Sequence, residues 1–162
     1  MADTLGLFFE RWIYKLLDEN ADKSNEITGS WNWTIGEDCG KKMRIMRSFQ
    51  HPEEVMQPQP SVYKGKYWAD PNSPEDYGHV HLLSSVGNKF VYELVQMVGF
   101  DVAAKFLFAT WKKLQPTSSY MDYRDLLKAT AAEFECLPQV LLCLNTVGLT
   151  DNAVSDWVPQ HQ

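Results

Sequence analysis

Between residues 84 and 148 the apolar side chains recur at the spacing of α-helices, and each run ends at a residue that stops a helix. The first run repeats every four residues, through Val86, Phe90, Leu94 and Val98, and Gly99 follows directly. A glycine in that place ends a helix well because it accepts left-handed backbone angles. The pattern therefore predicts a helix that begins at residue 84.

Three further helices are predicted downstream. We expect Asp101 to cap the second helix. Ser119, with Asp122 three residues later, has the pattern of a capping box at the start of the third helix. Pro138 suits the first turn of a fourth helix. Because short connections make neighbouring helices pack roughly antiparallel, we expect a mainly α chain with a four-helix region over residues 84–149.

The N-terminal half contains one helical pattern and is otherwise irregular. Apolar residues at helical spacing predict an amphipathic helix over residues 1–18. Residues 19–83 are rich in polar residues, Gly and Pro, so we expect a loop-rich segment with short extended pieces. Residues 150–162 are expected to form a tail. We expect all these segments to form one domain.

Charge and hydropathy exclude two kinds of partner. The chain has 162 residues and a net charge of −6, whereas nucleic-acid-binding domains cluster Lys and Arg. No apolar run approaches the roughly 18 residues that a membrane span needs. Since the chain opens inside an amphipathic pattern, we expect a piece of a longer protein; a short protein with an N-terminal helix is the alternative.

Residues 76–89, DYGHVHLLSSVGNK, contain the strongest candidate for chemistry. Asp76 lies five residues before His81. A carboxylate that reaches an imidazole fixes its tautomer and favours its charged form, which makes His81 a candidate to stabilise an oxyanion or transfer a proton. Two alternatives stay open: a solvated loop pair, or a metal site in which His79 and His81 point to one face of an extended chain, with Asp76 as a third ligand.

The order of these pieces resembles the C-terminal half of the thermolysin-like zinc metalloendopeptidases, or neutral proteases. The segments that carry the resemblance are ADTLGLFFE, WTIGED, MRSFQHPEE, DYGHVHLLSSVGNK, PTSSYMDYRDLLKATAAEF and LNTVGL. They occur in the family's order and at compatible spacing. The resemblance implies a helical C-terminal domain that carries the catalytic histidine of a peptide hydrolase.

The resemblance implies roles for six residues. His81 matches the family histidine that stabilises the tetrahedral intermediate, and Asp76 matches the carboxylate that orients it. Arg47 matches the arginine that binds a substrate carbonyl oxygen. Met46 and Ile35 match the substrate pocket, and Asp3 matches an acid that hydrogen-bonds a zinc-bound histidine.

The positions at which the chain departs from the family pattern are as informative as those at which it matches. The H-E-x-x-H segment and the third zinc-binding Glu are absent, so this chain supplies no zinc ligands and is expected to be inactive alone. Three residues of the block around His81 also differ. His79 and Ser85 replace glycines, and Leu83 replaces an asparagine. These changes put recognition of the substrate backbone in doubt.

The segment of this chain that matches the family's calcium-binding segment has fewer acidic ligands. Glu10 and Glu37 match its ligands, but Asn32 replaces an Asp and Thr34 replaces a Glu. Calcium prefers six to eight oxygen ligands with several carboxylates among them. The resemblance therefore implies at most a weak calcium site at Glu10, Asn32 and Glu37.

Two functions follow. In the first, the chain is the C-terminal half of a zinc endopeptidase that acts on a peptide or protein substrate, with zinc bound by residues outside this chain. In the second, it is a degenerate, non-catalytic domain for protein–protein interaction. Either way, a missing N-terminal half or another partner is expected to cover the same apolar face. The family resemblance implies secretion, and an unrelated helical bundle is a third interpretation.

Overall fold

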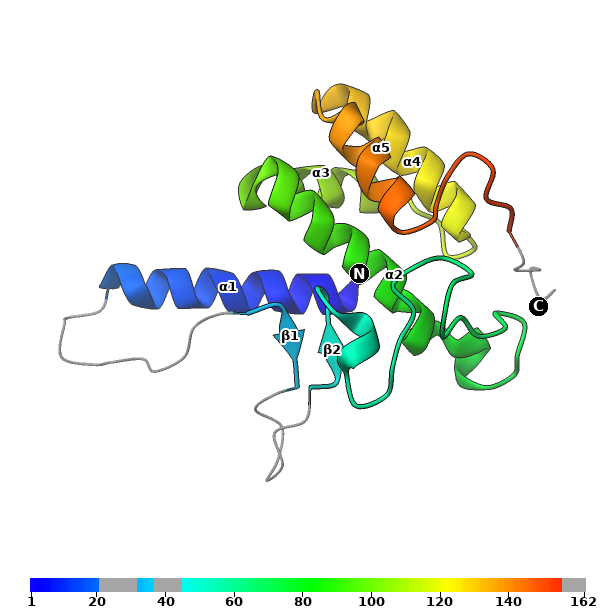
Figure 1. Ribbon diagram of the computed structural model, residues 1–162. Helices are drawn as coiled ribbons and strands as arrows, with labels where there is room; N and C mark the ends of the chain where they lie inside the picture. Colours follow the sequence, from blue (N-terminus) through cyan, green and yellow to red (C-terminus); the bar gives the residue numbers. More distant parts are fainter. Residues whose placement is uncertain (21–31, 37–44, 156–162) are drawn as a thin grey trace.

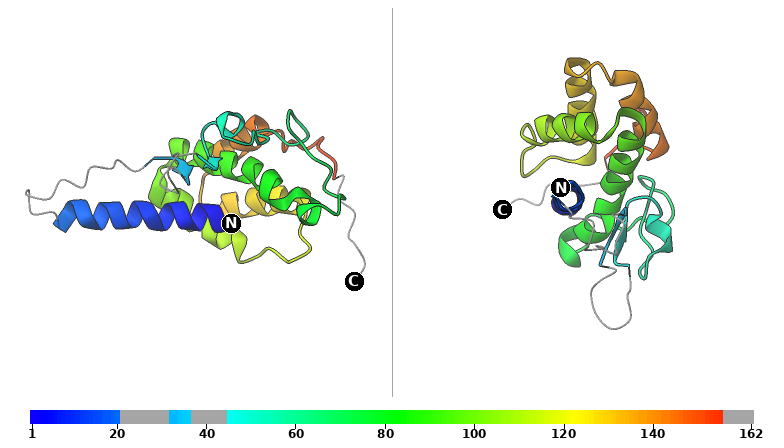
Figure 2. Two further views of the ribbon diagram at one scale, coloured as in Figure 1. Left: turned by 90° about the horizontal axis from the view of Figure 1, so that it is seen from below. Right: turned by 90° about the vertical axis from the view of Figure 1, so that its left-hand side faces the viewer.

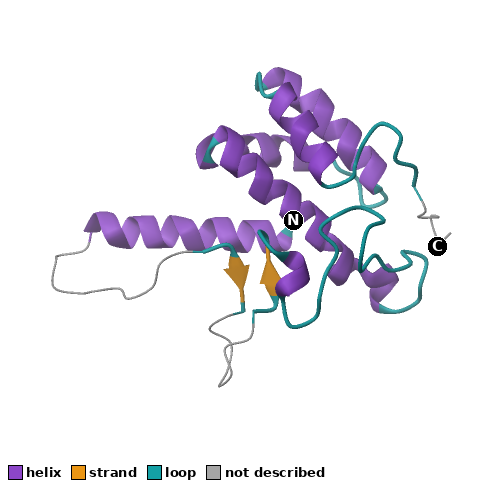
Figure 3. Ribbon diagram, in the orientation of Figure 1, coloured by secondary structure: helices purple, strands orange, loops and turns teal. Residues whose placement is uncertain are grey.

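The computed structural model describes residues 1–20, 32–36 and 45–155, and its arrangement is mainly helical (Figure 3). Helix α2 (Asp76–Val98) runs through the centre, as Figure 1 shows. Helices α3 (Phe100–Trp111) and α5 (Leu137–Thr146) pack against it, and α4 (Tyr120–Glu133) packs on α3 and α5. The mainly α fold expected from the apolar repeats is therefore confirmed.

The N-terminal half adds one long helix and a small ribbon. Helix α1 (Ala2–Asn20) starts beside α2 and extends away from it as an arm (Figures 1 and 2). Strands β1 (Thr34–Ile35) and β2 (Arg47–Ser48) form a two-stranded antiparallel ribbon, and a short helix, η1 (Pro52–Glu54), follows. None of the helices in the described part of the chain is long and apolar enough to cross a membrane.

The core lies where α2 meets the other helices. Val86, Phe90 and Leu94 of the four-residue repeat are fully buried, together with Phe106 of α3 and Leu127 of α4. Residues this completely buried each stabilise the fold by about 1.5–3 kcal/mol relative to exposure. The face that the sequence assigned to the core of α2 is therefore the one that the structure buries.

Two predicted helix boundaries are wrong. The second bundle helix starts at Phe100, with Gly99 as its N-cap, so Asp101 lies in the first turn instead of capping it. Helix α2 begins at Asp76, eight residues before the position that periodicity indicated. Periodicity misses this start because the first residues of α2 have left-handed backbone angles, which no apolar pattern reports.

Candidate active site

The candidate site is built on an unusual turn at the start of α2. Asp76, Tyr77, Gly78 and His79 have consecutive positive φ angles of 48°, 51°, 82° and 55°. Gly78 is needed there, since a Cβ at this position would lie 2.2 Å from the carbonyl oxygen of Pro71. Three non-glycine residues with positive φ store strain, and strain of this kind concentrates at functional sites.

The turn brings Asp76 and His81 into contact. The carboxylate of Asp76 accepts a hydrogen bond from the backbone N–H of His81 at 3.1 Å, and its other oxygen contacts Nδ1 of the same ring. Since an ionised carboxylate can only accept, Nδ1 carries the proton of this contact. The hydrogen bond from the His81 ring is the main reason that the pKa of Asp76 lies below its ordinary value.

The His81 ring remains available to another molecule. Its side chain is 74% exposed, whereas that of Asp76 is 35% exposed. With Nδ1 held by the carboxylate, Nε2 is the nitrogen left for another molecule, and it can donate a hydrogen bond to a bound anion when the ring carries both protons. The arrangement can therefore present an oriented imidazole to an oxygen on which negative charge develops.

Arg47 lies at a second contact point, where β2, α1 and α2 meet. Its Nε is 3.5 Å from Oδ2 of Asp3, and the same oxygen accepts a hydrogen bond of 2.8 Å from Nδ2 of Asn88. Within the part of the chain that the structure describes, Arg47 makes no hydrogen bond or ion pair with Asp76 or His81. The six residues implied by the resemblance thus form two groups.

The two residues assigned to a substrate pocket lie next to each other on the ribbon. The backbone N–H of Met46 donates to the carbonyl of Ile35 at 2.9 Å, and Ile35 is the strand partner of Arg47. Met46 is half exposed and Ile35 is half-buried. Ile35 therefore shares a face of the ribbon with Arg47, whereas Met46 adjoins Arg47 along the chain.

The hypothesis of a His79–His81 metal pair rests on an extended chain, and this premise is wrong. His79 is the last residue of the left-handed turn, and His81 already lies in the helix. Nε2 of His79 is 3.9 Å from a carboxylate oxygen of Glu75. Among the residues described, no group of three or more His, Cys, Asp or Glu side chains could hold a metal ion, so the side chains present do not fit a complete zinc site.

The calcium ligands expected from the sequence are only partly described. Glu10 is half-buried in α1, whereas Asn32 is exposed and its side-chain oxygen accepts a hydrogen bond of 2.9 Å from the backbone of Thr34. Glu37 lies outside the described residues. The calcium site stays a prediction.

The residues that replace family glycines and asparagine have structural roles here. Ser85 is buried, and its hydroxyl lies 2.6 Å from the carbonyl oxygen of Pro60 and 2.7 Å from that of Leu82. Leu83 is also buried, and its carbonyl accepts a hydrogen bond of 2.7 Å from Tyr120. These residues therefore attach the site-bearing turn of α2 to the loop before it and to α4.

Sequence reasoning gave Asn88 no role, although it is buried and holds Asp3. An isolated Asn among apolar helix residues was the available signal, because a buried amide needs a partner.

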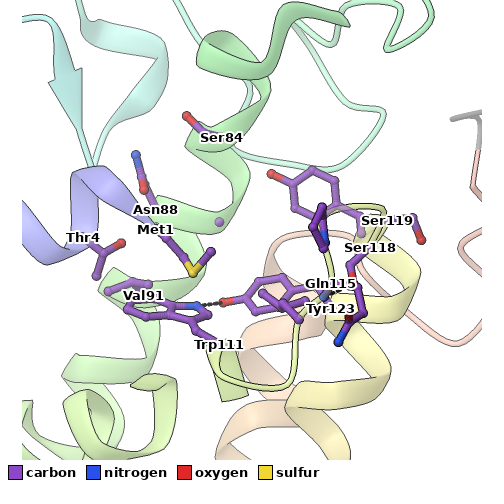
Figure 4. Close-up of a pocket in the computed structure, with 14 residues that line it drawn as sticks. Met1, Thr4, Ser84, Asn88, Val91, Trp111, Gln115, Ser118, Ser119 and Tyr123 are labelled. Carbon is purple, nitrogen blue, oxygen red and sulfur yellow. Dashed lines mark hydrogen bonds between the residues drawn. The ribbon is translucent and has the colours of Figure 1, made fainter. Parts of the chain in front are cut away.

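Asn88 also borders a cleft of about 370 Å³ between the start of α1, α2 and the connection before α4 (Figure 4). Trp111 and Tyr123 form one wall, where the Trp111 N–H lies 3.4 Å from the Tyr123 hydroxyl and burial raises the pKa of Tyr123 to about 12.

Comparison with known proteins finds matches over most of the chain. Residues 1–137 match the family described as "Thermolysin metallopeptidase, alpha-helical domain". A zinc metalloproteinase of Renibacterium salmoninarum is 28% identical over 146 residues, which cover 82% of this chain and 24% of that protein. The neutral protease NprE of Bacillus pumilus is 27% identical over 133 residues, covering 81% of this chain and 43% of the relative.

A bacillolysin of Bacillus amyloliquefaciens is 28% identical over 152 residues, covering 91% of this chain and 29% of the relative. The chain thus spans less than half the length of each of these relatives.

Proposed function

Since the chain belongs to the thermolysin metallopeptidase family, as its alpha-helical domain, we propose that it supplies the oxyanion-stabilising half of a peptide-hydrolysing site. The observation that carries the proposal is the contact of Asp76 with an exposed His81 on a strained turn. The other half of the site, including the residues that bind the zinc of a metallopeptidase, would come from outside this chain.

His81 is proposed to act on the carbonyl oxygen of the peptide bond that is cut. When a nucleophile adds to that carbonyl, negative charge develops on the oxygen, and a donor held in place beforehand stabilises it without reorganisation. Asp76 holds Nδ1 and the backbone N–H of His81, so the ring is oriented before substrate arrives. Losing one such donor typically costs about 10²–10³ in rate.

Arg47 is proposed to bind a substrate carbonyl next to the pocket formed by Met46 and Ile35. The Asp3 ion pair uses Nε of Arg47, which leaves the two terminal nitrogens of the guanidinium for a carbonyl oxygen. Asp3 is held by both Arg47 and Asn88, so its carboxylate is fixed at the start of α1. From that position we propose that it orients a metal-binding histidine of the other half.

The test is reassembly. The 162-residue chain alone is expected to show no cleavage of casein, whereas a mixture with an N-terminal half from one of the relatives is expected to show cleavage that a chelator abolishes. His81→Ala should lower that rate by about 10²–10³. His51→Ala is the matched control, since His51 is also exposed and lies 4.0 Å from a carboxylate, that of Glu54.

Two results would contradict the proposal. Chelator-sensitive cleavage by the pure chain would show that it carries a complete site. Equal rates for His81→Ala and the unchanged chain in the mixture would remove His81 from the chemistry.

We propose a second function, protein–protein interaction, because α1 carries an exposed apolar stripe. Leu5, Phe9 and Trp12 lie at helical spacing and are 50%, 61% and 53% exposed. Exposed apolar patches mark surfaces that other proteins cover. We propose that the missing half, or a partner in its place, covers this stripe whether or not catalysis survives.

Binding to the N-terminal half tests this surface directly. Replacing Phe9 and Trp12 by Ser should weaken association, measured by calorimetry, by at least tenfold, since large aromatic side chains dominate interface energies. Val154→Ser is the control, because Val154 is 69% exposed on a different part of the molecule. Equal affinities for all three proteins would exclude the stripe from the interface.

Two further properties follow from the resemblance and are proposed with it. The whole protein is proposed to be secreted, which detection in culture medium or in cells would decide.

Calcium is proposed to bind weakly at Glu10, Asn32 and Glu37. With a dissociation constant near 1 mM, adding 1 mM calcium should stabilise the fold by about 0.4 kcal/mol in a thermal melt, and a gain of several kcal/mol would contradict a weak site.

A further inference from the structure

A second cleft, of about 400 Å³, lies directly beside the turn that carries Asp76 and His81. Gly78 and Val80, which lie between those two residues in the sequence, form part of its lining. Its volume is within the range of about 300–1,000 Å³ typical of sites for small ligands. The cleft is therefore continuous with the proposed catalytic turn, yet distinct from the pocket assigned to Met46 and Ile35.

Four aromatic rings line this cleft, and three of them are fixed by one another. The rings of Tyr63 and Trp68 lie 4.7 Å apart with their planes at 67°, and the ring of Tyr120 is 5.7 Å from that of Tyr63. Tyr120 is further held by its hydrogen bond to the carbonyl of Leu83. The fourth ring, Tyr77, is 91% exposed, so it has contact area to offer to a ligand.

The lining favours an uncharged ligand. The residues that line the cleft, all within the described ranges, include no Asp, Glu, Lys, Arg or His. Of its hydroxyls, Ser119 already accepts a hydrogen bond from the backbone of Asp122, and Ser84 donates to the carbonyl of His81. A charged side chain would lose its hydration there without gaining a partner.

We propose that this cleft binds an uncharged aromatic side chain of the peptide whose bond lies at His81. Aromatic rings attract one another in edge-to-face and offset geometries beyond the burial of area, and the exposed ring of Tyr77 is available for such a contact. The inference rests on the proposed peptidase function for its substrate, but peptide binding can be measured without any cleavage.

The experiment uses the full chain and three peptides with blocked ends: acetyl-Gly-Phe-Gly-amide and its Leu and Lys counterparts. Binding is followed by NMR at the Gly78 amide and the Trp68 indole N–H. The Phe peptide should bind most tightly, and Tyr77→Ala should weaken it about threefold to tenfold. Tyr67→Ala is the matched control, since Tyr67 is also an exposed tyrosine with positive φ and lies outside the cleft lining.

Four results would overturn the inference. They are equal binding of the Phe and Lys peptides, equal effects of the two Tyr→Ala variants, an absence of shifts at Gly78 and Trp68, and a gain in affinity of fivefold or more on removing residues 156–162. The last result would identify the chain's own tail as the occupant. None of these results bears on cleavage in the reassembly assay, which tests the peptidase function separately.

Discussion

At the scale of single residues, Gly78 is the position of the candidate site that least tolerates a side chain. Its φ of 82° and the 2.2 Å approach that a Cβ would make to Pro71 leave no room for a side chain. The residue after it, His79, occupies a position that is a second glycine in the family pattern and accepts a φ of 55°. Only one glycine of the pair is therefore required by this backbone.

Gly78→Ala should destabilise the chain by about 1–3 kcal/mol, since the alanine needs both a left-handed backbone and a displaced loop. Gly6→Ala is the control. Gly6 lies in α1 with no atom within 4 Å of an added Cβ, so that change should stabilise by about 0.5–1 kcal/mol. Urea denaturation measures both values, and a neutral Gly78→Ala would show that the turn adjusts freely.

Ser85 gives the second prediction at this scale. Ser85→Ala should cost about 1–3 kcal/mol, because it leaves the buried carbonyl oxygen of Pro60 without its hydroxyl partner. Ser84→Ala should cost less, since Ser84 is only half-buried and its hydroxyl meets a carbonyl of its own helix turn. Equal losses in denaturation would mean that the Pro60 contact adds nothing specific.

At the scale of elements, the capping box of α4 couples helix stability to pH. Asp122 accepts a hydrogen bond of 2.7 Å from the backbone N–H of Ser119, and this bond is the main reason that the pKa of Asp122 lies below its ordinary value of 3.8. A carboxyl group whose pKa is lowered on folding stabilises the protein at pH values above the pKa that it has in the unfolded chain. That contribution is lost as the pH falls through the pKa that the group has in the folded protein.

Asp122→Ala should therefore cost about 1 kcal/mol at pH 7, and the difference from the unchanged chain should shrink as the pH is lowered from 4 toward 2. The free energy of unfolding at a series of pH values measures it. Thr117→Ala, an exposed change in the preceding loop, should show no such trend. A pH-independent difference would exclude the ionised carboxylate as its source.

The same helix shows what local sequence can and cannot predict. The capping box at Ser119 was predicted because its two residues are three positions apart and need nothing else. The Asn88–Asp3 bond joins residues 85 positions apart, and no periodic pattern indicates it. The turn at residues 76–79 was missed because non-glycine residues such as Tyr rarely have positive φ. The chemistry of Asp76 and His81 could be proposed from spacing, whereas their left-handed support could not.

At the scale of the whole molecule, the segment after α5 is fastened back onto the bundle. Nη1 of Arg124 donates to the carbonyls of Thr150 and Ala153 at 2.9 and 3.3 Å. The hydroxyl of Tyr63 donates to the carbonyl of Val154 at 3.0 Å. These contacts lead the chain from α5 across α4 to the loop beside the aromatic cleft, where Ser155 forms part of the lining.

Arg124→Met should release this segment while leaving the core intact. Hydrogen exchange of the amides at residues 149–154 should accelerate by roughly tenfold, which corresponds to about 1.4 kcal/mol of lost local stability. Lys105→Met, an exposed change on α3, is the control and should leave those amides unchanged. Unaltered exchange in Arg124→Met would assign the fastening to other contacts, such as the Tyr63 hydrogen bond and the Lys128–Asp151 ion pair.

The four consecutive positive φ angles at residues 76–79 have a consequence for chirality. Backbone angles that strain L-amino acids are the relaxed angles of their mirror images, and the penalty for L-residues is roughly 1–2 kcal/mol each. A chain assembled by chemical ligation with D-tyrosine at position 77 would lose the strain at that position, while Asp76 and His79 would keep theirs. Ribosomal synthesis can place only one achiral amino acid, glycine, at such positions. Because three of the four residues of this turn are L-amino acids, contacts with the rest of the molecule hold the turn in its left-handed conformation.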